Sequence, residues 1–581
     1  MKSWLAVIVF YALVSPNLLP AREAIPAKIL SKLPAYVDRL MAEWKVPGLS
    51  ATVVKGDEVI WERGFGHVPG AKHAVVSPET PFAIGSATKA FTAMGLMLLV
   101  QERKVDLDQP VASYLPGFKI ADPYITANLT VRDILTHRSG IPRHDLVWFG
   151  SERSREELVK AIAFLPIGRD WRMRFQYNNL MYALAGYLTE KVSGKRWEEF
   201  IRQEVFTPLG MTHSDFSFPI SERGSDNAMA PAGAIVSTVR DLSLWLRFFL
   251  RGGKAGGKTV LAEQLIAEMQ TPQMVIGAFP TVGENAMTAY GLGWFIGCYR
   301  GHHMVYHDGA VKGFTSIICF LPQEKIGIAV LCNASLSPVP EVVALEALDR
   351  LLGLPQIAWE KKAAKNFFKS SQNMAMRIRE LRSSQRVPGT QPSHALTEYA
   401  GIYTHPAYGE MEVRQREEGL IALFRGRELK LAHQHYDIFI LQDPQIEQIL
   451  ENYGDIEVQF NSDLQGKVAS AEVRFEPEAE PVRMLKKEPE QFTSAEYLER
   501  FAGVYASENS DITIYVQNQT LFASLAGGGQ VIELVPEKEN LFCFKIQPMM
   551  KVEFQIGGKG KAMAAILIHP GGQSIAKRKA D

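Results

Sequence analysis

The chain has 581 residues, 46% of them hydrophobic, which is enough apolar material for more than one buried core. Its 63 Lys and Arg residues equal its 63 Asp and Glu residues, so its formal net charge is zero. Because such a chain has no overall basic field, we expect no nucleic-acid partner.

The N-terminus has the pattern of a secretory signal peptide. An apolar run at residues 4–14 follows Lys2, and a region with the small residues Ala21 and Ala24 comes after it. The polar residues at 15–17 leave this run too short to span a bilayer. We therefore expect residues 1–24 to be a signal peptide and the protein to be exported, either periplasmic or secreted. The alternative is an uncleaved segment that anchors the chain to a membrane.

The first elements after this segment are a helix and a hairpin. The pattern predicts a helix over residues 33–43 and strands over 49–54 and 58–63. The sequence Lys55-Gly56-Asp57 between the two strands is typical of a turn.

The sequence Ser86-Ala87-Thr88-Lys89 is an S-x-x-K motif between Gly85 and an apolar helical stretch at 90–100. Three residues are nearly one helical turn, so the Ser86 hydroxyl and the Lys89 amine share a face. The helix N-terminus stabilises a developing anion, and a desolvated lysine can act as a base. These two residues therefore have the chemistry of an activated serine nucleophile.

Two further polar motifs follow along the chain. Tyr177-Asn178-Asn179 precedes a helical stretch at 180–192, and His307-Asp308-Gly309 follows a predicted strand at 304–306. A literal Ser225-Asp226-Asn227 also lies between the first and third motifs. Both Tyr177 and Ser225 are therefore candidates for a second catalytic element.

The region from Ser86 to about residue 270 is largely helical, and strands then return. They are predicted at 291–298, 304–306, 315–320 and 327–331, before a helix at 341–352. Strands at both ends with helices between them predict an α+β fold for residues 25–360. We expect an antiparallel sheet flanked by N- and C-terminal helices, plus an inserted helical subdomain, with the active site in the cleft between them.

The remaining chain is predicted to be a linker and two similar β units. Residues 361–394 are rich in Lys and Arg and are typical of a solvated linker, so we expect the catalytic core to fold without the β units. The units at 395–488 and 489–581 are small barrels or sandwiches by strand density. An internal repeat relates them: Tyr399-Ala400-Gly401-Ile402-Tyr403 recurs as Phe501-Ala502-Gly503-Val504-Tyr505, and Glu457-Val458-Gln459-Phe460 recurs as Glu553-Phe554-Gln555-Ile556.

The three polar motifs together resemble those of the serine β-lactamase and penicillin-binding-protein superfamily, in its class C, esterase and D-aminopeptidase branch. That branch carries Tyr-x-Asn as its second element, and Tyr177 stands about where it places its tyrosine, so we favour Tyr177 over Ser225. The resemblance covers residues 30–355 and implies a β-lactamase/DD-peptidase-like fold. The two β units look like the lipocalin-like barrels of D-aminopeptidase-type relatives. Three other segments look like landmarks of the family: residues 135–142, 231–238 and 290–294.

The resemblance implies catalysis through an acyl-enzyme on Ser86. Lys89 and Tyr177 are the candidate carriers of the serine proton, and the sequence leaves open which of them is the base. Family geometry assigns the oxyanion hole to the backbone N–H groups of Ser86 and Ala310.

The residues implied to bind substrate are Asn179, His307, Asp308 and Gly309. Asn179 would hold a substrate amide, and Gly309 lets the strand approach the acyl group closely. His307 stands where lactamases commonly carry lysine, so the permanent cation that helps to seat a β-lactam carboxylate is absent. Asp308 could favour an imidazolium at His307, meet a substrate amine, or merely cap the strand end.

Other polar groups carry weaker signals. His302 and His303 accompany His307, but neighbours on a strand point to opposite faces, so we expect no metal and no cofactor. The four cysteines fit no zinc pattern and favour buried free thiols, with one disulfide among the first three as the alternative. Arg143-His144-Asp145 is interpreted either as part of the cleft lining or as an exposed turn.

The sequence therefore favours a serine hydrolase, either an esterase for small acyl substrates or a peptidase for peptides with a D-residue or a free amino terminus. One alternative is a true β-lactamase or DD-peptidase. Another is a non-catalytic penicillin-binding or sensor protein. In each case the partner is a small ester, peptide or β-lactam-like molecule.

Overall fold

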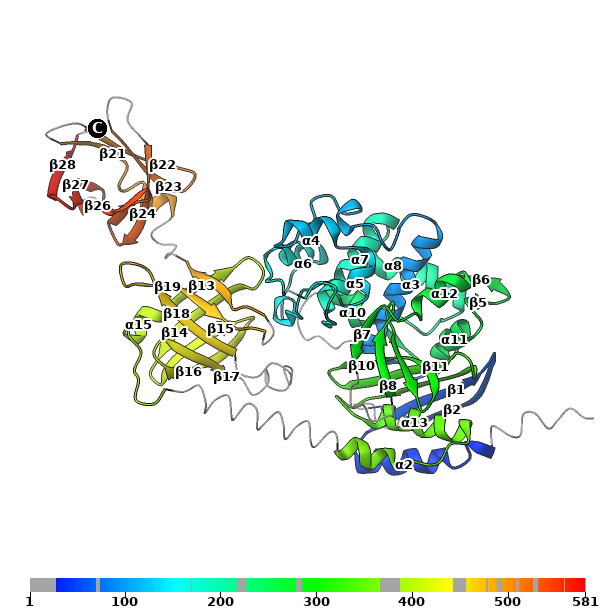
Figure 1. Cartoon of the computed structure of the whole chain (residues 1–581). Helices are drawn as coiled ribbons and strands as arrows, with labels where there is room; N and C mark the ends of the chain where they lie inside the picture. Colours follow the sequence, from blue (N-terminus) through cyan, green and yellow to red (C-terminus); the bar gives the residue numbers. More distant parts are fainter. Residues whose placement is uncertain are drawn as a thin grey trace, which may run out of the picture.

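The computed structural model describes residues 28–68, 74–168, 170–216, 226–277, 285–365, 387–442, 456–476, 479–487, 494–507, 511–525, 531–558 and 560–579. Figure 1 shows a domain of mixed helices and strands, followed by two β-barrels. The expected signal peptide at 1–24 and most of the expected linker at 361–394 lie outside the described residues.

An eight-stranded antiparallel sheet lies at the centre of the first domain, in the order β2-β1-β12-β11-β10-β9-β8-β7. β1 and β12 come from opposite ends of the domain, and Ala51 pairs with Val330. Their long apolar runs arise because both faces of these strands are covered. The strands are β1 (Gly48–Lys55), β2 (Glu58–Gly66), β7 (Met274–Gly277), β8 (Asn285–Tyr290), β9 (Phe295–Tyr299), β10 (His302–Val311), β11 (Phe314–Leu321) and β12 (Ile326–Cys332).

Helices cover both faces of this sheet. Helix α2 (Leu33–Glu43) and helix α13 (Val339–Leu352) pack on one face, in a core that contains Leu40, Val330 and Leu345. The helical subdomain packs on the other face, in a core that contains Leu331 and Trp245. Its helices are α3 (Thr88–Gln101), α4 (Pro123–Asn128), α5 (Val131–Leu135), α6 (Arg155–Ala161), α7 (Asn179–Ser193), α8 (Trp197–Ile201), α9 (Thr207–Leu209), α10 (Ala230–Gly233), α11 (Val239–Leu250) and α12 (Glu263–Met269).

Each C-terminal unit is a closed eight-stranded barrel. The repeated motif has the same function in both, because the Tyr403 hydroxyl donates to the Tyr399 carbonyl (2.8 Å) and the Tyr505 hydroxyl donates to the Phe501 carbonyl (2.7 Å). The first barrel contains β13 (Gly401–His405), β14 (Gly409–Arg416), β15 (Gly419–Phe424), β16 (Arg427–His435), β17 (Ile438–Gln442), β18 (Ile456–Ser462), β19 (Val468–Val473) and β20 (Val482–Lys486). The second contains β21 (Gly503–Ala506), β22 (Asp511–Gln517), β23 (Thr520–Leu525), β24 (Val531–Lys538), β25 (Leu541–Phe544), β26 (Gln547–Ile556), β27 (Ala562–His569) and β28 (Gly572–Arg578).

The structure confirms the predicted fold class and changes some details. The strand expected at 291–298 begins only at Phe295, because Gly293 has a φ of +76° in the preceding turn. β7 and β8 were not predicted. All four cysteines are free, so the alternative of a disulfide is wrong. In the described residues, no helix is long and apolar enough to cross a membrane.

Candidate active site

Ser86 lies in a single turn of 3₁₀-helix (Gly85–Ala87) that leads directly into α3. Gly85 has a φ of +54°, a conformation that glycine adopts without strain. The turn leaves Ser86 half-buried, whereas the whole first turn of α3 is buried. The hydroxyl is therefore presented at the N-terminal end of a helix, as the S-x-x-K spacing predicted.

Lys89 is fully buried and contacts the nucleophile. Its Nζ lies 3.1 Å from Ser86 Oγ, and it donates to Asn179 Oδ1 and to the Ala232 carbonyl, both at 2.8 Å. Burial, with a smaller effect of the nearby Arg143 cation, holds the pKa of the Lys89 amine well below its ordinary value. Lowering the pKa favours the neutral form of the amine, in which the two carbonyl oxygens accept its two hydrogens and its lone pair faces the Ser86 hydroxyl.

Asp145 sets the orientation of the Asn179 amide. The Asn179 Nδ2 group donates to Asp145 Oδ1 (3.1 Å), so its carbonyl oxygen faces Lys89. Asp145 also accepts from Trp148 Nε1 (3.0 Å) and from Arg143 Nε (2.8 Å). It is buried, so this segment is not the exposed turn that the sequence left open.

Tyr177 lies against the same pair of residues. Burial raises the pKa of its phenol, and a hydrogen bond with Ser86 opposes that effect. Its ring packs on the His137 ring, with centroids 4.3 Å apart, and the Arg143 guanidinium lies 5.2 Å above it. Because the raised pKa keeps the phenol protonated near neutral pH, Tyr177 can donate a proton more readily than it can accept one.

The Ser86 turn approaches the edge of β10 very closely. β10 pairs with β9 only as far as Tyr306, so residues 307–311 present an open edge to this turn. A Cβ on Gly85 would lie 2.8 Å from the Ala310 nitrogen, and a Cβ on Gly309 would lie 1.9 Å from the Ile84 carbonyl oxygen. Only glycine fits at either position, and the contact brings the backbone of Ala310 next to the nucleophile turn.

His307 is buried and neutral. Its Nε2 lies 3.0 Å from the Tyr290 hydroxyl, and its Nδ1 lies 2.6 Å from the Asp308 carbonyl, which can only accept. Nδ1 therefore carries the hydrogen, and Nε2 accepts from Tyr290. Burial lowers the pKa of His307 to about 3. Burial and the nearby Lys89 outweigh the hydrogen bond to the Asp308 carbonyl, so this environment favours the neutral imidazole over the imidazolium.

Asp308 is exposed at the edge of the site. The surrounding walls partly desolvate its carboxyl and raise its pKa, while Lys89 opposes that effect. The Asp308 charge in turn raises the pKa of Tyr177 and of Lys89, so the carboxylate lies within electrostatic reach of the nucleophile's neighbours.

His137 supports the Tyr177 loop, a role that sequence reasoning missed. Its Nδ1 accepts the Asn178 backbone N–H (3.1 Å), and burial lowers the pKa of its ring, so it is neutral. Its ring also packs on Tyr182 and Tyr290. The sequence feature that could have identified His137 is its position in the family-like segment at residues 135–142.

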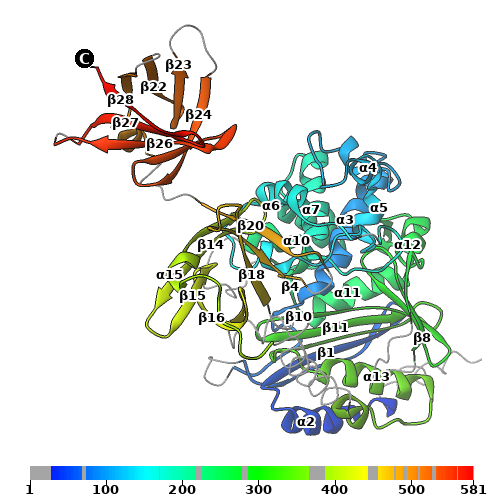
Figure 2. The same ribbon diagram turned by 60° about the vertical axis from the view of Figure 1, so that its left-hand side comes forward.

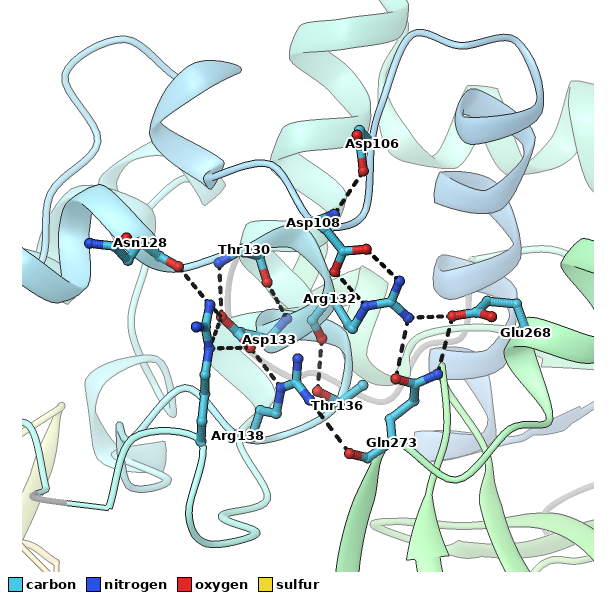
Figure 3. Close-up of polar contacts among 11 residues, drawn as sticks. Asp106, Asp108, Asn128, Thr130, Arg132, Asp133, Thr136, Arg138, Glu268 and Gln273 are labelled. Atoms are coloured by element: carbon cyan, nitrogen blue, oxygen red, sulfur yellow. Dashed lines mark hydrogen bonds and ion pairs between the residues drawn. The ribbon is translucent and has the colours of Figure 1, made fainter.

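A polar network holds the loop that carries His137 (Figure 3). The buried Asp133 carboxylate accepts from Arg138 Nε (2.6 Å) and from Arg172 Nη2 (2.7 Å). Arg132, one residue earlier on α5, binds Asp108 and Glu268, and so ties α5 to α12. These charge-assisted bonds join the loop that carries His137 to Arg172, which lies just before the Tyr177 loop.

The remaining sequence candidates lie away from this site. His302 pairs with Glu324, and His303 lies 3.4 Å from Gln323. Among the described residues, no group of three His, Cys, Asp or Glu side chains could hold a metal. The Ser225-Asp226-Asn227 side chains lie outside the described part of the chain.

Comparison with known proteins finds family models that match the first domain and the first barrel. A family model described as Beta-lactamase matches residues 33–352, and a model described as a domain of unknown function, DUF3471, matches residues 385–486, which contain the first barrel. Unguisins hydrolase ungD of Aspergillus violaceofuscus is 27% identical over 422 residues, which cover 64% of this chain and 74% of that protein. Protein flp of Staphylococcus aureus is 26% identical over 335 residues, which cover 54% of this chain and 64% of that protein.

A solved structure shows the same fold. The octameric penicillin-binding protein homologue from Pyrococcus abyssi aligns with a TM-score of 0.50 and 26% identity, and it covers 79% of this chain and 100% of that chain. The beta-lactamase model matches more than half of the chain and spans the Ser86 site, so the chain belongs to the beta-lactamase family of serine hydrolases.

Proposed function

We propose that this protein hydrolyses an amide or ester bond through an acyl-enzyme on Ser86, and that its preferred substrates are small and carry a protonated amine. The observation that carries the reaction type is the buried Lys89 amine, 3.1 Å from Ser86 Oγ with two carbonyl acceptors on its other side. The relative named unguisins hydrolase supports a hydrolytic reaction.

The geometry favours Lys89 over Tyr177 as the base. As Ser86 Oγ attacks the carbonyl carbon, its proton passes to the Lys89 lone pair. The negative charge that develops on the substrate oxygen is stabilised by the backbone N–H groups of Ser86 and Ala310. Tyr177 gives its proton to the leaving group and regains one from Lys89. Water then hydrolyses the acyl-enzyme by the reverse proton path.

Asp308 supports the amine preference. It is an exposed carboxylate within electrostatic reach of Lys89 and Tyr177, so it attracts a cationic substituent and repels an anionic one. The neutral His307 supplies no cation for a carboxylate. Both features disfavour β-lactams, which carry a carboxylate, and we therefore place the peptidase or esterase function above the β-lactamase function.

A substrate panel tests this proposal. The purified chain is assayed on D- and L-aminoacyl anilides, on their N-acetylated forms, on a nitrophenyl ester and on a chromogenic cephalosporin. A charge-assisted bond contributes about 1.5–3 kcal/mol, so we expect the free amine to raise kcat/KM by roughly ten- to a hundredfold. Asp308→Asn should remove that advantage, measured as the ratio of kcat/KM between the free-amine and the N-acetylated forms.

Three outcomes would contradict the proposal. If the cephalosporin is hydrolysed faster than any ester or anilide, the β-lactamase function takes first place. If Ser86→Ala retains the wild-type rate on the best substrate, the nucleophile is another residue. Covalent labelling of Ser86 without turnover of any substrate would favour the sensor function.

A further inference from the structure

We propose that the first barrel is part of the catalytic apparatus: it positions the loop at residues 144–153, and through Asp145 it holds Asn179 in the orientation that Lys89 needs. This inference rests on the proposed roles of Lys89 and Asn179. It assigns a positioning function to residues more than two hundred positions away in sequence.

The barrel reaches the loop through the turn between β13 and β14. Tyr408, in that turn, is fully buried, and its hydroxyl lies 2.7 Å from His144 Nδ1. His144 is also fully buried, and its φ of +48° is strained for a residue with a side chain. Its Nε2 lies 3.4 Å from the Pro166 carbonyl, so Nδ1 is free to accept the Tyr408 hydroxyl.

Two arginines strengthen this contact from opposite sides. Arg153, at the end of the loop, donates to the carbonyls of Pro406 (2.9 Å) and Ala407 in the barrel turn. Arg425, between β15 and β16, donates to the Val147 carbonyl (3.0 Å). The loop is therefore bonded to two different turns of the barrel.

Apolar packing makes the two domains continuous. The core of the helical subdomain extends without a break from Leu146 and Val147 to Tyr408 and Phe475. The Tyr408 ring stacks on Phe475 with centroids 4.2 Å apart. Tyr408 is thus held rigidly, and it can impose its position on His144.

The loop transmits this position to the catalytic lysine. Asp145 follows His144 directly, and Asp145 accepts from Asn179, whose carbonyl oxygen accepts from Lys89. If Asn179 turned, Lys89 would lose one of the two acceptors that leave its lone pair for Ser86. The charged and titratable groups that face Lys89 are Arg143, Asp145, Asp308, His137, His307, Tyr177 and Tyr182.

The test uses the full chain and matched tyrosine variants. Tyr408→Phe keeps the ring and removes only the hydroxyl that contacts His144. Tyr403→Phe removes a hydroxyl that bonds within the same barrel, to the Tyr399 carbonyl, and serves as the control. The measurement is the rate at which a fluorophosphonate labels Ser86, followed by intact mass across a range of pH.

We expect labelling of Tyr408→Phe to be roughly five- to tenfold slower than labelling of the wild type, since a buried hydrogen-bond partner is lost, while Tyr403→Phe stays within about twofold. The acidic limb of the labelling rate should also move to higher pH in Tyr408→Phe, because a looser site desolvates Lys89 less. Arg425→Ala should have the same effect, and Arg425→Lys should restore part of the rate.

The outcomes separate this inference from the proposed function. If the wild type is not labelled on Ser86, the proposed function fails. Suppose that the wild type is labelled, and that Tyr408→Phe and Arg425→Ala have the same labelling rate and the same pH dependence of that rate as Tyr403→Phe. Only the positioning role of the barrel is then overturned. Thermal melts show whether each variant is folded. A lower melting temperature with an unchanged labelling rate counts against the inference.

Discussion

The first and second barrels derive from the same repeat, yet their buried side chains belong to different cores. Tyr408, Phe424 and Phe475 of the first barrel belong to the core of the helical subdomain, whereas the second barrel has a core of its own around Phe501 and Phe554. Figures 1 and 2 show the second barrel standing away from the catalytic domain in both views. The same fold can therefore be an integral part of the catalytic unit or an independent appendage, depending on a few turn residues.

Deletion of each barrel should show the difference between them most clearly. A chain that stops after residue 487 lacks only the second barrel, and we expect its kcat/KM to stay within about twofold of the full chain. A chain that stops after residue 365 also lacks the first barrel, which uncovers Leu146 and Val147, and we expect it to be largely insoluble or inactive. The linker composition alone predicted instead that the catalytic core folds without the β units.

Solubility, near-UV circular dichroism and kcat/KM of the two truncated chains are the measurements. A chain ending at residue 365 that is folded and fully active would show that the first barrel is also an appendage.

A matched pair of core truncations should have the next largest effect. Phe475→Ala in the first barrel and Phe554→Ala in the second each remove a buried aromatic ring and should cost about 3–5 kcal/mol of stability in their own core. Only Phe475→Ala should also slow catalysis, because Phe475 supports Tyr408. Denaturant unfolding and steady-state kinetics measure the two effects. Equal catalytic losses in both variants would remove the distinction between the barrels.

Acid should loosen the first barrel selectively. Burial lowers the pKa of His144 to about 4, and burial together with Arg153 lowers the pKa of His405 to about 4. Because these values lie below the ordinary value of 6.5, the unfolded state binds more protons than the docked state as the pH falls below 6.5. The stability of this contact is therefore present above pH 6.5 and is lost as the pH falls toward 4.

Thermal melts between pH 7.5 and 4.5 test this sign. His144→Gln should flatten the pH dependence of the melt, and His569→Gln in the second barrel is the control. Identical pH dependence in the wild type and in His144→Gln would be the contrary result.

The local elements were largely predictable, whereas the contacts between domains were not. The helix at 33–43 and the S-x-x-K turn carry strong periodicity and composition signals, and the structure contains both. The repeat around Tyr403 and Tyr505 predicted two similar barrels. By contrast, the pairing of His144 with Tyr408 joins residues 264 positions apart, and such a contact leaves no periodic trace in one sequence.

The charge state of the site was also beyond sequence reasoning. His307 next to Asp308 looked like a candidate imidazolium, but burial makes His307 neutral. Burial of a single side chain depends on the packing of distant strands and helices, which spacing alone does not reveal. The same limit applies to β7 and β8, strands of four and six residues, of which β7 forms one edge of the sheet.

The smallest expected effect concerns an arginine at the surface of the contact. Arg427 lies 5.4 Å above the Phe149 ring, across the boundary between the first barrel and the loop. Arg427→Gln should weaken docking by about 0.5–1 kcal/mol, visible as faster hydrogen exchange in the loop at 144–153. Arg500→Gln, which removes a similar contact with Tyr497 inside the second barrel, is the matched control. An equal change of exchange in that loop for both variants would contradict the assignment.

The central claim is that a neutral Lys89 activates Ser86, and the pH dependence of Ser86 labelling tests it most directly. The wild type, Ser86→Ala and His307→Gln are treated with a fluorophosphonate, and adducts are counted by intact mass. The account predicts one adduct on Ser86, none on Ser86→Ala, and a labelling rate that rises with pH through the lowered pKa of Lys89 in both the wild type and His307→Gln. A labelling rate independent of pH, or an adduct that persists on Ser86→Ala, would contradict it.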